Sequence, residues 1–170
     1  MKRRCWVVIA ALILVTPLVA GPIFSKPKEI PDEVRCLADL KKFSVVVLPM
    51  PEEVAPYVST NRVKNQINSM LEQAGFEILE DDTALPQCVV RVNAAIDPAQ
   101  PNSLSVYAIL AVRQKVLVHR IDQTLSIPTT SVHGVILTTR DRLKSELDKH
   151  MMSMVNLLVR TVRAATRHQN

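Results

Sequence analysis

Glycine is scarce in this chain: the 170 residues include three. Three scattered glycines cannot form a Gly-rich phosphate loop, and no G-x-S-x-G nucleophile elbow is present. Aromatic residues are also few, at 4%, which argues against a sugar-stacking platform or an aromatic cage. These shortages exclude several ligand and enzyme classes, and they predict a core of aliphatic side chains.

A catalytic or metal-binding constellation is also lacking. The chain has four histidines: His119, His133, His150 and His168. The first two fall on strands that are expected to pair, but no Cys or acid is placed to complete a metal site. Hydroxyls in residues 126–131 lie near His133, yet no helix N-terminus adjoins them to supply an oxyanion hole. We therefore predict a non-enzyme with no catalytic residues, no cofactor and no metal.

The N-terminus carries the clearest targeting signal. A basic start is followed by an almost uninterrupted apolar run over residues 6–20, which ends at Gly21 and Pro22. This order is typical of a secretory signal, and the run is shorter than the ~20 residues of a spanning helix. Residues 1–20 are predicted to be a signal peptide or, as the alternative, an uncleaved N-terminal anchor. The protein is expected to be exported, periplasmic or extracellular, and an uncleaved N-terminus would tether it to the inner membrane.

The charge of the chain belongs largely to this leader. The whole sequence has a formal net charge of +5, but residues 21–170 have 18 Lys and Arg against 16 Asp and Glu, a net +2. A nearly neutral domain without interleaved aromatics is unlike a nucleic-acid-binding surface. No nucleic-acid partner is expected.

Three cysteines invite a redox interpretation. Cys5 precedes the apolar run, whereas a lipid-attachment cysteine would follow one, so acylation is not expected. Cys36 and Cys88 are the pair that would remain after export, and two cysteines in an exported chain suggest a disulfide. Two apolar buried thiols that never meet are the alternative.

The first half of the chain predicts alternating helices and strands. The expected elements are a short helix over 31–41, a buried strand over 43–48, a helix from Ser59 or Thr60 to Gly75, and a strand over 76–79. Ser and Thr are favoured helix N-caps, and glycine is favoured just after a helix. The run FSVVVL is short and rich in β-branched residues, which favours a strand over a helix.

The second half predicts longer strands and one long helix. Alternating side chains indicate strands over 88–96, 104–119 and 129–137, with turns at 97–103 and 120–126. Thr138 or Thr139 can cap a last helix whose apolar stripe runs from Leu143 to Ala165 at spacings of three and four. On the strand over 104–119, the apolar side runs from Leu104 through Val112 to Val116 and Val118.

The fold class that satisfies every stripe is α/β (α+β). We predict one mixed, mostly antiparallel sheet of four or five strands, with two longer helices packed on one face. The expected organisation is the leader 1–20, a linker 21–30 that contains two prolines, and a single α/β domain over 31–170.

One face of such a sheet remains open to water or to a partner. On the strand 104–119 the open face is expected to carry a mixture of apolar, aromatic and basic residues as the predicted interface: Tyr107, Ile109, Arg113, Lys115 and Leu117. Tyrosine and arginine are enriched at protein interfaces. Ordinary scattered surface residues are the alternative.

A second apolar line on the last helix is the other place where a partner could bind. It consists of Met152, Val155 and Val159. The line predicts either a wide buried face or an exposed contact.

A resemblance rests on Phe43–Leu48 followed by the helix end and strand MLEQAGFEIL at residues 70–79. This strand, helix, L-x-x-x-G-F and strand are similar to small bacterial envelope α/β domains, such as the N-terminal domain of the Tol-system propeller protein, over about a third of the chain. The resemblance implies a protein-interaction or assembly role and transfers no functional residue.

The sequence therefore predicts an exported cell-envelope protein that acts as a non-catalytic interaction or assembly module with an envelope protein partner. Membrane association would come through residues 1–20. A binder of a small apolar or lipid ligand between the helices and the sheet is the alternative, and a hydrolase of unrecognised type is the weaker one.

Overall fold

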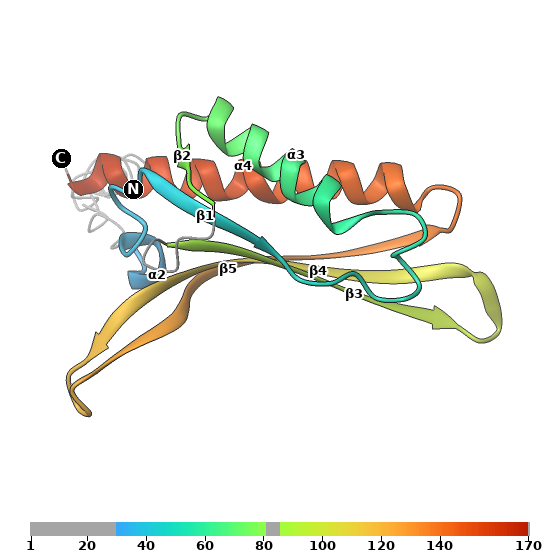
Figure 1. Cartoon of the computed structure of the whole chain (residues 1–170), viewed down its shortest axis with the longest axis horizontal. Coiled ribbons are helices and arrows are strands. Elements are labelled where there is room, and N and C mark those ends of the chain that lie inside the picture. Colours follow the sequence, from blue (N-terminus) through green and yellow to red (C-terminus); the bar gives the residue numbers. More distant parts are fainter. Residues whose placement is uncertain (1–29, 81–85, 170) are drawn as a thin grey trace, which may run out of the picture.

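The computed structural model describes residues 30–80 and 86–169. They form one five-stranded sheet in the order β2-β1-β3-β4-β5, with the two longer helices, α3 and α4, on one face (Figure 1). The predicted leader, 1–20, and all but the last residue of the predicted linker, 21–30, lie outside the described residues. The predicted fold class, a mixed sheet with helices on one side, is confirmed.

The elements follow one another in the predicted order. They are α2 (Asp32–Arg35), β1 (Lys42–Val47), α3 (Thr60–Gln73), β2 (Glu77–Ile78), β3 (Gln87–Asp97), β4 (Gln100–Val118), β5 (Gln123–Thr139) and α4 (Leu143–Gln169). The strand β1 pairs in parallel with β2 and β3, whereas β4 pairs antiparallel with β3 and β5. Because the three longest strands pair antiparallel, most of the pairing in the sheet is antiparallel, as predicted.

The ends of α3 agree with the sequence. The Ser59 side chain accepts a hydrogen bond from the Arg62 amide at 3.3 Å, which caps the helix start. Gly75, with a φ of 91°, occupies the left-handed region that ends the helix. The chain then enters β2, and Phe76 contacts Phe43 of β1 edge to face at a ring-centroid distance of 5.2 Å.

The core lies between the helices and the sheet. The α4 stripe from Leu143 to Ala165 is buried, and so are the alternate β4 residues from Leu104 to Val112. An ion pair between Arg62 and Asp148 joins α3 to α4 on the outside. Within the described part of the chain, no helix is both long and apolar enough to span a membrane.

The predicted helix over 31–41 is wrong in length. Only Asp32–Arg35 is helical, and a turn follows as far as Asp39. Asp39 has a φ of 59°, in the left-handed region that aspartate tolerates better than most residues. A helix cannot continue through that conformation, so no helical residue follows before β1.

The hairpin between β4 and β5 is longer than predicted. Pairing continues to Val118 and Gln123, so residues predicted as a turn over 120–126 belong in part to β5. The end of this hairpin projects from the body, away from the helices (Figure 1). Val116 and Val118, predicted to be core residues, are therefore only half-buried.

Candidate functional site

The open face of the sheet is the surface that the helices leave uncovered. Its residues lie in rows across β3, β4 and β5, because directly paired residues point to the same side. The four rows are Val89–Ala111–Ser131, Arg91–Ile109–His133, Asn93–Tyr107–Val135 and Ala95–Ser105–Leu137. The residues between them along each strand point into the core. Six of these twelve side chains are aliphatic, and Tyr107 and His133 add two rings.

Two β5 residues of this face are unusually exposed for their type. Val135 is 62% exposed and Leu137 is 82% exposed. They stand beside Tyr107 and Ser105 respectively, so the exposed apolar surface is continuous with the aromatic ring of β4. Single exposed apolar residues are ordinary, but a contiguous patch marks an interaction surface.

A hydrogen-bonded cluster occupies the middle of the open face. The Tyr107 hydroxyl contacts His133 Nδ1, and Ser131 Oγ lies 2.7 Å from His133 Nε2. The Tyr107 and His133 rings stack with centroids 5.8 Å apart. Because both ring nitrogens of His133 are engaged, the imidazole and the phenol are held in fixed orientations.

This cluster resembles a catalytic triad only in part. In hydrolases a carboxylate orients the histidine and stabilises its charged form. Here a neutral phenol takes that position, and His133 is exposed on a strand rather than set in a cleft. The arrangement favours the positioning of side chains on a surface over nucleophilic catalysis.

The histidines do not form a metal site. His133 pairs with Ile109 in the middle of β4, whereas His119 follows the far end of the same strand. Although their strands pair as predicted, His119 and His133 lie far apart, because ten residues of β4 and its turn, at ~3.3 Å each, separate His119 from Ile109. Among the described residues, no group of three or more His, Cys, Asp or Glu side chains could hold a metal ion.

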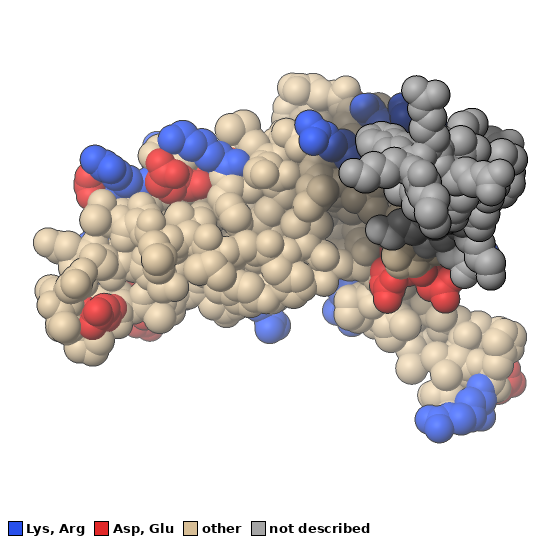
Figure 2. Space-filling model, turned by 180° about the vertical axis from the view of Figure 1, so that it is seen from behind, with Lys and Arg blue, Asp and Glu red and all other residues tan. Residues whose placement is uncertain are grey.

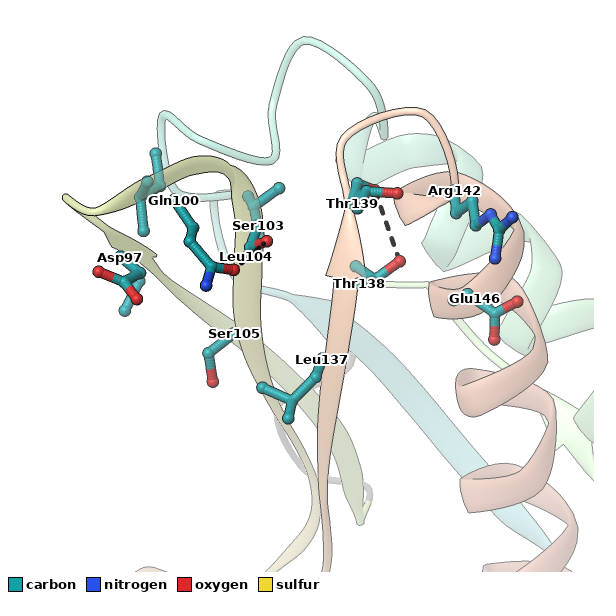
Figure 3. A pocket seen from close by; sticks show the side chains of 12 residues that line it. Asp97, Gln100, Ser103, Leu104, Ser105, Leu137, Thr138, Thr139, Arg142 and Glu146 are labelled. Carbon is teal, nitrogen blue, oxygen red and sulfur yellow. Dashed lines mark hydrogen bonds between the residues drawn. The ribbon is translucent and has the colours of Figure 1, made fainter.

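A pocket of about 700 Å³ lies at the end of the sheet opposite the projecting hairpin. It is lined by the β3–β4 turn, the end of β5 and the first turns of α4. Figure 3 shows Leu137 and Ser105 on one side, with Arg142 and Glu146 on α4 across from them. The pocket thus adjoins the open face at Leu137 and adds charged groups to its rim.

The free edge of β5 borders α4. Val135, Ile136 and Leu137 line a groove of about 350 Å³ together with residues of α4. Gly134, on the same strand, lies directly against the His150 ring, so a Cβ at position 134 would stand 1.7 Å from His150 Nε2. The glycine allows helix and edge strand to approach each other.

The predicted interface residues fall on two separate parts of the molecule. Tyr107 and Ile109 lie on the open face as expected. Arg113 still pairs with Gln87 of β3, one row beyond Val89 and Ala111, whereas Lys115 and Leu117 lie on the projecting hairpin, where β4 pairs with β5 alone. All five residues lie on the same side of β4, but β3 covers the flank of the strand only as far as Arg113, and the predicted interface stays a prediction.

Sequence analysis missed Val135 and Leu137, the most exposed apolar residues of the face. A signal was present: His133, Val135 and Leu137 alternate with Val132, Gly134 and Ile136. Both sets are partly apolar, so the pattern alone does not tell which set is buried.

The second apolar line, on α4, is a wide buried face. Val155 is 1% exposed and Val159 is 7% exposed, whereas Met152 is 41% exposed. Of the two interpretations, the buried face holds for the two valines. Met152 does not continue their contact with the core, so the line offers no extended docking surface.

In place of the predicted disulfide, the structure has two free thiols. Cys88 is buried on β3, whereas the Cys36 thiol donates to the Glu33 carbonyl at 3.1 Å and lies 3.9 Å from the Thr129 carbonyl on β5. Strands β3 and β5 flank β4, so they are about 10 Å apart. A disulfide needs Cα atoms within ~7 Å, which this placement of Cys36 beside β5 does not allow.

We expect the two thiols to react very differently. Burial raises the pKa of Cys88 to about 12, so no thiolate forms near neutral pH, whereas Cys36 is exposed. A maleimide at pH 8 should label Cys36 in the native protein and Cys88 only after unfolding. Peptide mass spectrometry measures both, with fully denatured protein as the control. Protection of both residues in non-reduced native and denatured material would instead restore the disulfide.

The comparisons with known proteins identify no family. No family model matches the chain, and no curated protein matches it. Solved structures are similar at low levels, and three of them are bacterial lipoproteins. One is a minor lipoprotein from Acinetobacter baumannii, with 10% identity and a TM-score of 0.36 over 76% of this chain and 93% of that one.

The other two structures are a rare lipoprotein B and a lipoprotein B. The first, from Shewanella oneidensis, has 9% identity and a TM-score of 0.32 over 75% of this chain and 95% of that one. The second, from Nitrosomonas europaea, has 7% identity and a TM-score of 0.31 over 83% and 89%. At these values no function is transferred from them, and the resemblance to the Tol-system domain stays a prediction.

Proposed function

We propose that this chain is an exported, non-catalytic cell-envelope protein that binds a protein partner through the open face of its sheet. The observation that supports this most directly is the exposure of Leu137 and Val135 beside Tyr107. Burial of one such aliphatic side chain is worth about 1.5–3 kcal/mol. A partner that covers this patch would therefore gain affinity without any change in the fold.

The rest of the face has the composition of an interface centre with a polar rim. Tyr107, held by His133, is a pre-oriented aromatic group, so little side-chain entropy is lost when a partner packs on it. Arg91 and Asn93 on β3 are exposed and supply polar groups at the margin. The leader supports the envelope location, since an apolar run after a basic start directs a chain to export.

The alternative of a small apolar ligand between the helices and the sheet has less support. That layer is filled by packed core side chains from α3, α4 and the sheet. A ligand there would have to displace them, whereas a partner on the open face displaces only water.

The decisive experiment captures partners from the cell envelope with a tagged full-length chain. Leu137→Glu should lower the recovery of a stoichiometric protein partner by about 30-fold or more, as expected for a hot-spot side chain worth ~2 kcal/mol. Tyr107→Ala should act in the same direction. Both variants should keep a thermal midpoint close to that of the parent, because neither position belongs to the buried core.

The matched control is Leu157→Glu. Leu157 is 51% exposed, like Leu137 an aliphatic surface residue, but it lies on α4 away from the open face. Equal recovery with both glutamate variants would overturn the proposed surface. Mass spectrometry of the same eluates for lipid decides the alternative, because lipid in place of protein would support ligand binding.

A further inference from the structure

The projecting end of the β4–β5 hairpin, residues 113–128, is here named the arm. At the base of the arm, β3 begins at Gln87 opposite Arg113, so from this pair toward the tip β4 pairs with β5 alone. Figure 1 shows the arm bending away from the helices. A two-stranded ribbon without a covering layer is at best marginally stable in water. The arm therefore gains most from a surface that covers it.

The arm carries more apolar side chains than a hairpin surrounded by water requires. Leu117, Ile121 and Leu125 are 47%, 46% and 39% exposed. The half-buried Val116, Val118 and Ile127 continue the apolar stripe of the sheet past the end of its core. Apolar side chains are thus present on both sides of the arm and at its tip. This distribution favours insertion into a fluid apolar phase over docking on one flat protein surface.

We infer that the arm docks on the surface of an anionic phospholipid bilayer, with its tip in the interfacial zone. The charge of the arm supports this occupant. Its cations are Arg113, Lys115 and Arg120, against one acid, Asp122. Figure 2 shows basic side chains at the end of the arm, away from those along the helices. Each cation near an anionic membrane contributes about 1 kcal/mol.

Two of these cations are available to lipid headgroups. The Arg113 guanidinium donates to the Ser126 carbonyl at 2.9 Å and stiffens the base of the arm. Lys115 and Arg120 form no ion pair with any other described residue. A second copy of this arm would bring like charges together, which disfavours self-association as the way to cover it.

The position of the N-terminal segment gives an independent argument. The Gln114 amide at the base of the arm donates to the Cys36 carbonyl and to Thr129 Oγ1, both at 3.0 Å. The described chain begins at Ile30, a few residues before Cys36, so it enters the domain beside the arm. The apolar run of the leader ends at Ala20.

The lengths are compatible with one shared bilayer. Residues 21–29 can span at most about 30 Å. The arm measures about 20 Å from its base to its turn, at ~3.3 Å per strand residue. Nine residues are therefore long enough to connect an uncleaved leader to a domain whose arm tip lies at the same membrane surface. An uncleaved leader and the arm then form two points of attachment.

The test uses the full chain in phosphatidylcholine vesicles that contain phosphatidylglycerol. A nitroxide is attached at Ile121→Cys, in a chain in which Cys5 and Cys36 are serine and Cys88 remains buried. The control label is at Leu157→Cys on α4. The label at 121 should become inaccessible to a water-soluble nickel complex and accessible to oxygen, whereas the label at 157 should stay accessible to nickel.

Charge reversal distinguishes docking on anionic lipid from purely apolar adsorption and from contact between proteins. Lys115→Glu with Arg120→Glu should return most of the label at 121 to water, and purely zwitterionic vesicles should do the same. Leu137→Glu, on the open face, should leave the label protected. Full nickel accessibility at 121 in anionic vesicles would overturn the inference. Protection that appears only at high protein density would also overturn it, in favour of a second copy.

Discussion

Leu110→Ala should lower the free energy of unfolding by about 2–5 kcal/mol, whereas Leu137→Ala should change it by no more than about 0.5 kcal/mol. The two leucines lie on neighbouring strands, but Leu110 is fully buried and Leu137 is 82% exposed. Removal of Leu110 leaves a cavity between the sheet and the helices. Truncation of Leu137 leaves no cavity and only reduces the apolar surface that is exposed to water.

Urea unfolding followed by circular dichroism measures both variants, with Leu157→Ala as a helical surface control. Because the substitution is the same throughout, the difference reports burial and not the chemistry of the change. If Leu137→Ala proved as destabilising as Leu110→Ala, the open face would be a second core, and the proposed interface would have to be abandoned.

Gly134→Ala should destabilise the protein by about 1–2 kcal/mol, although alanine normally improves a strand position held by glycine. Glycine in a strand costs roughly 0.5–1 kcal/mol relative to alanine. Here the added Cβ would stand 1.7 Å from His150 Nε2 and 2.2 Å from Cε1, so the ring has to leave its place between α4 and β5. Overpacking of this kind costs about 1–3 kcal/mol.

The sign should reverse when the ring is absent. In a His150→Ala background, Gly134→Ala should stabilise the protein by about 0.5–1 kcal/mol, because only the strand preference remains. A double-mutant cycle measured by urea unfolding gives the coupling between the two positions. Additive effects would contradict the contact between α4 and β5 that places His150 over the edge strand.

The elements with strong local signals were predictable. The Ser59 cap, Gly75, and the stripe from Leu143 to Ala165 each depend on residues within a few positions of one another. The same holds for the alternation of Leu104 to Val112, which placed Tyr107 and Ile109 on the open face correctly. The helix over 31–41 is wrong in length because the chain changes to turn hydrogen bonds after Arg35 and reaches a left-handed residue at Asp39, neither of which periodicity reveals.

The candidate site was only half predictable. Tyr107 belongs to a strand with one clear apolar side, whereas Val135 and Leu137 belong to a strand that is apolar on both. Their exposure is decided by the register with β4, in which Val135 stands opposite Tyr107. Register is a long-range property, so the neighbours of these residues along the chain do not specify it.

The sequence by itself determined the aliphatic core, the element order and the α/β class, because each follows from composition or from a period of two or 3.6 residues. Only the tertiary structure decided which apolar residues have a covering layer. Val112 and Val116 continue one stripe, yet Val112 is buried and Val116 is not, since the third strand of the sheet ends between them. It also separated Cys36 from Cys88 and brought Gly134 against His150. A stripe records which side of a strand is apolar, and burial depends on what the rest of the chain packs against it.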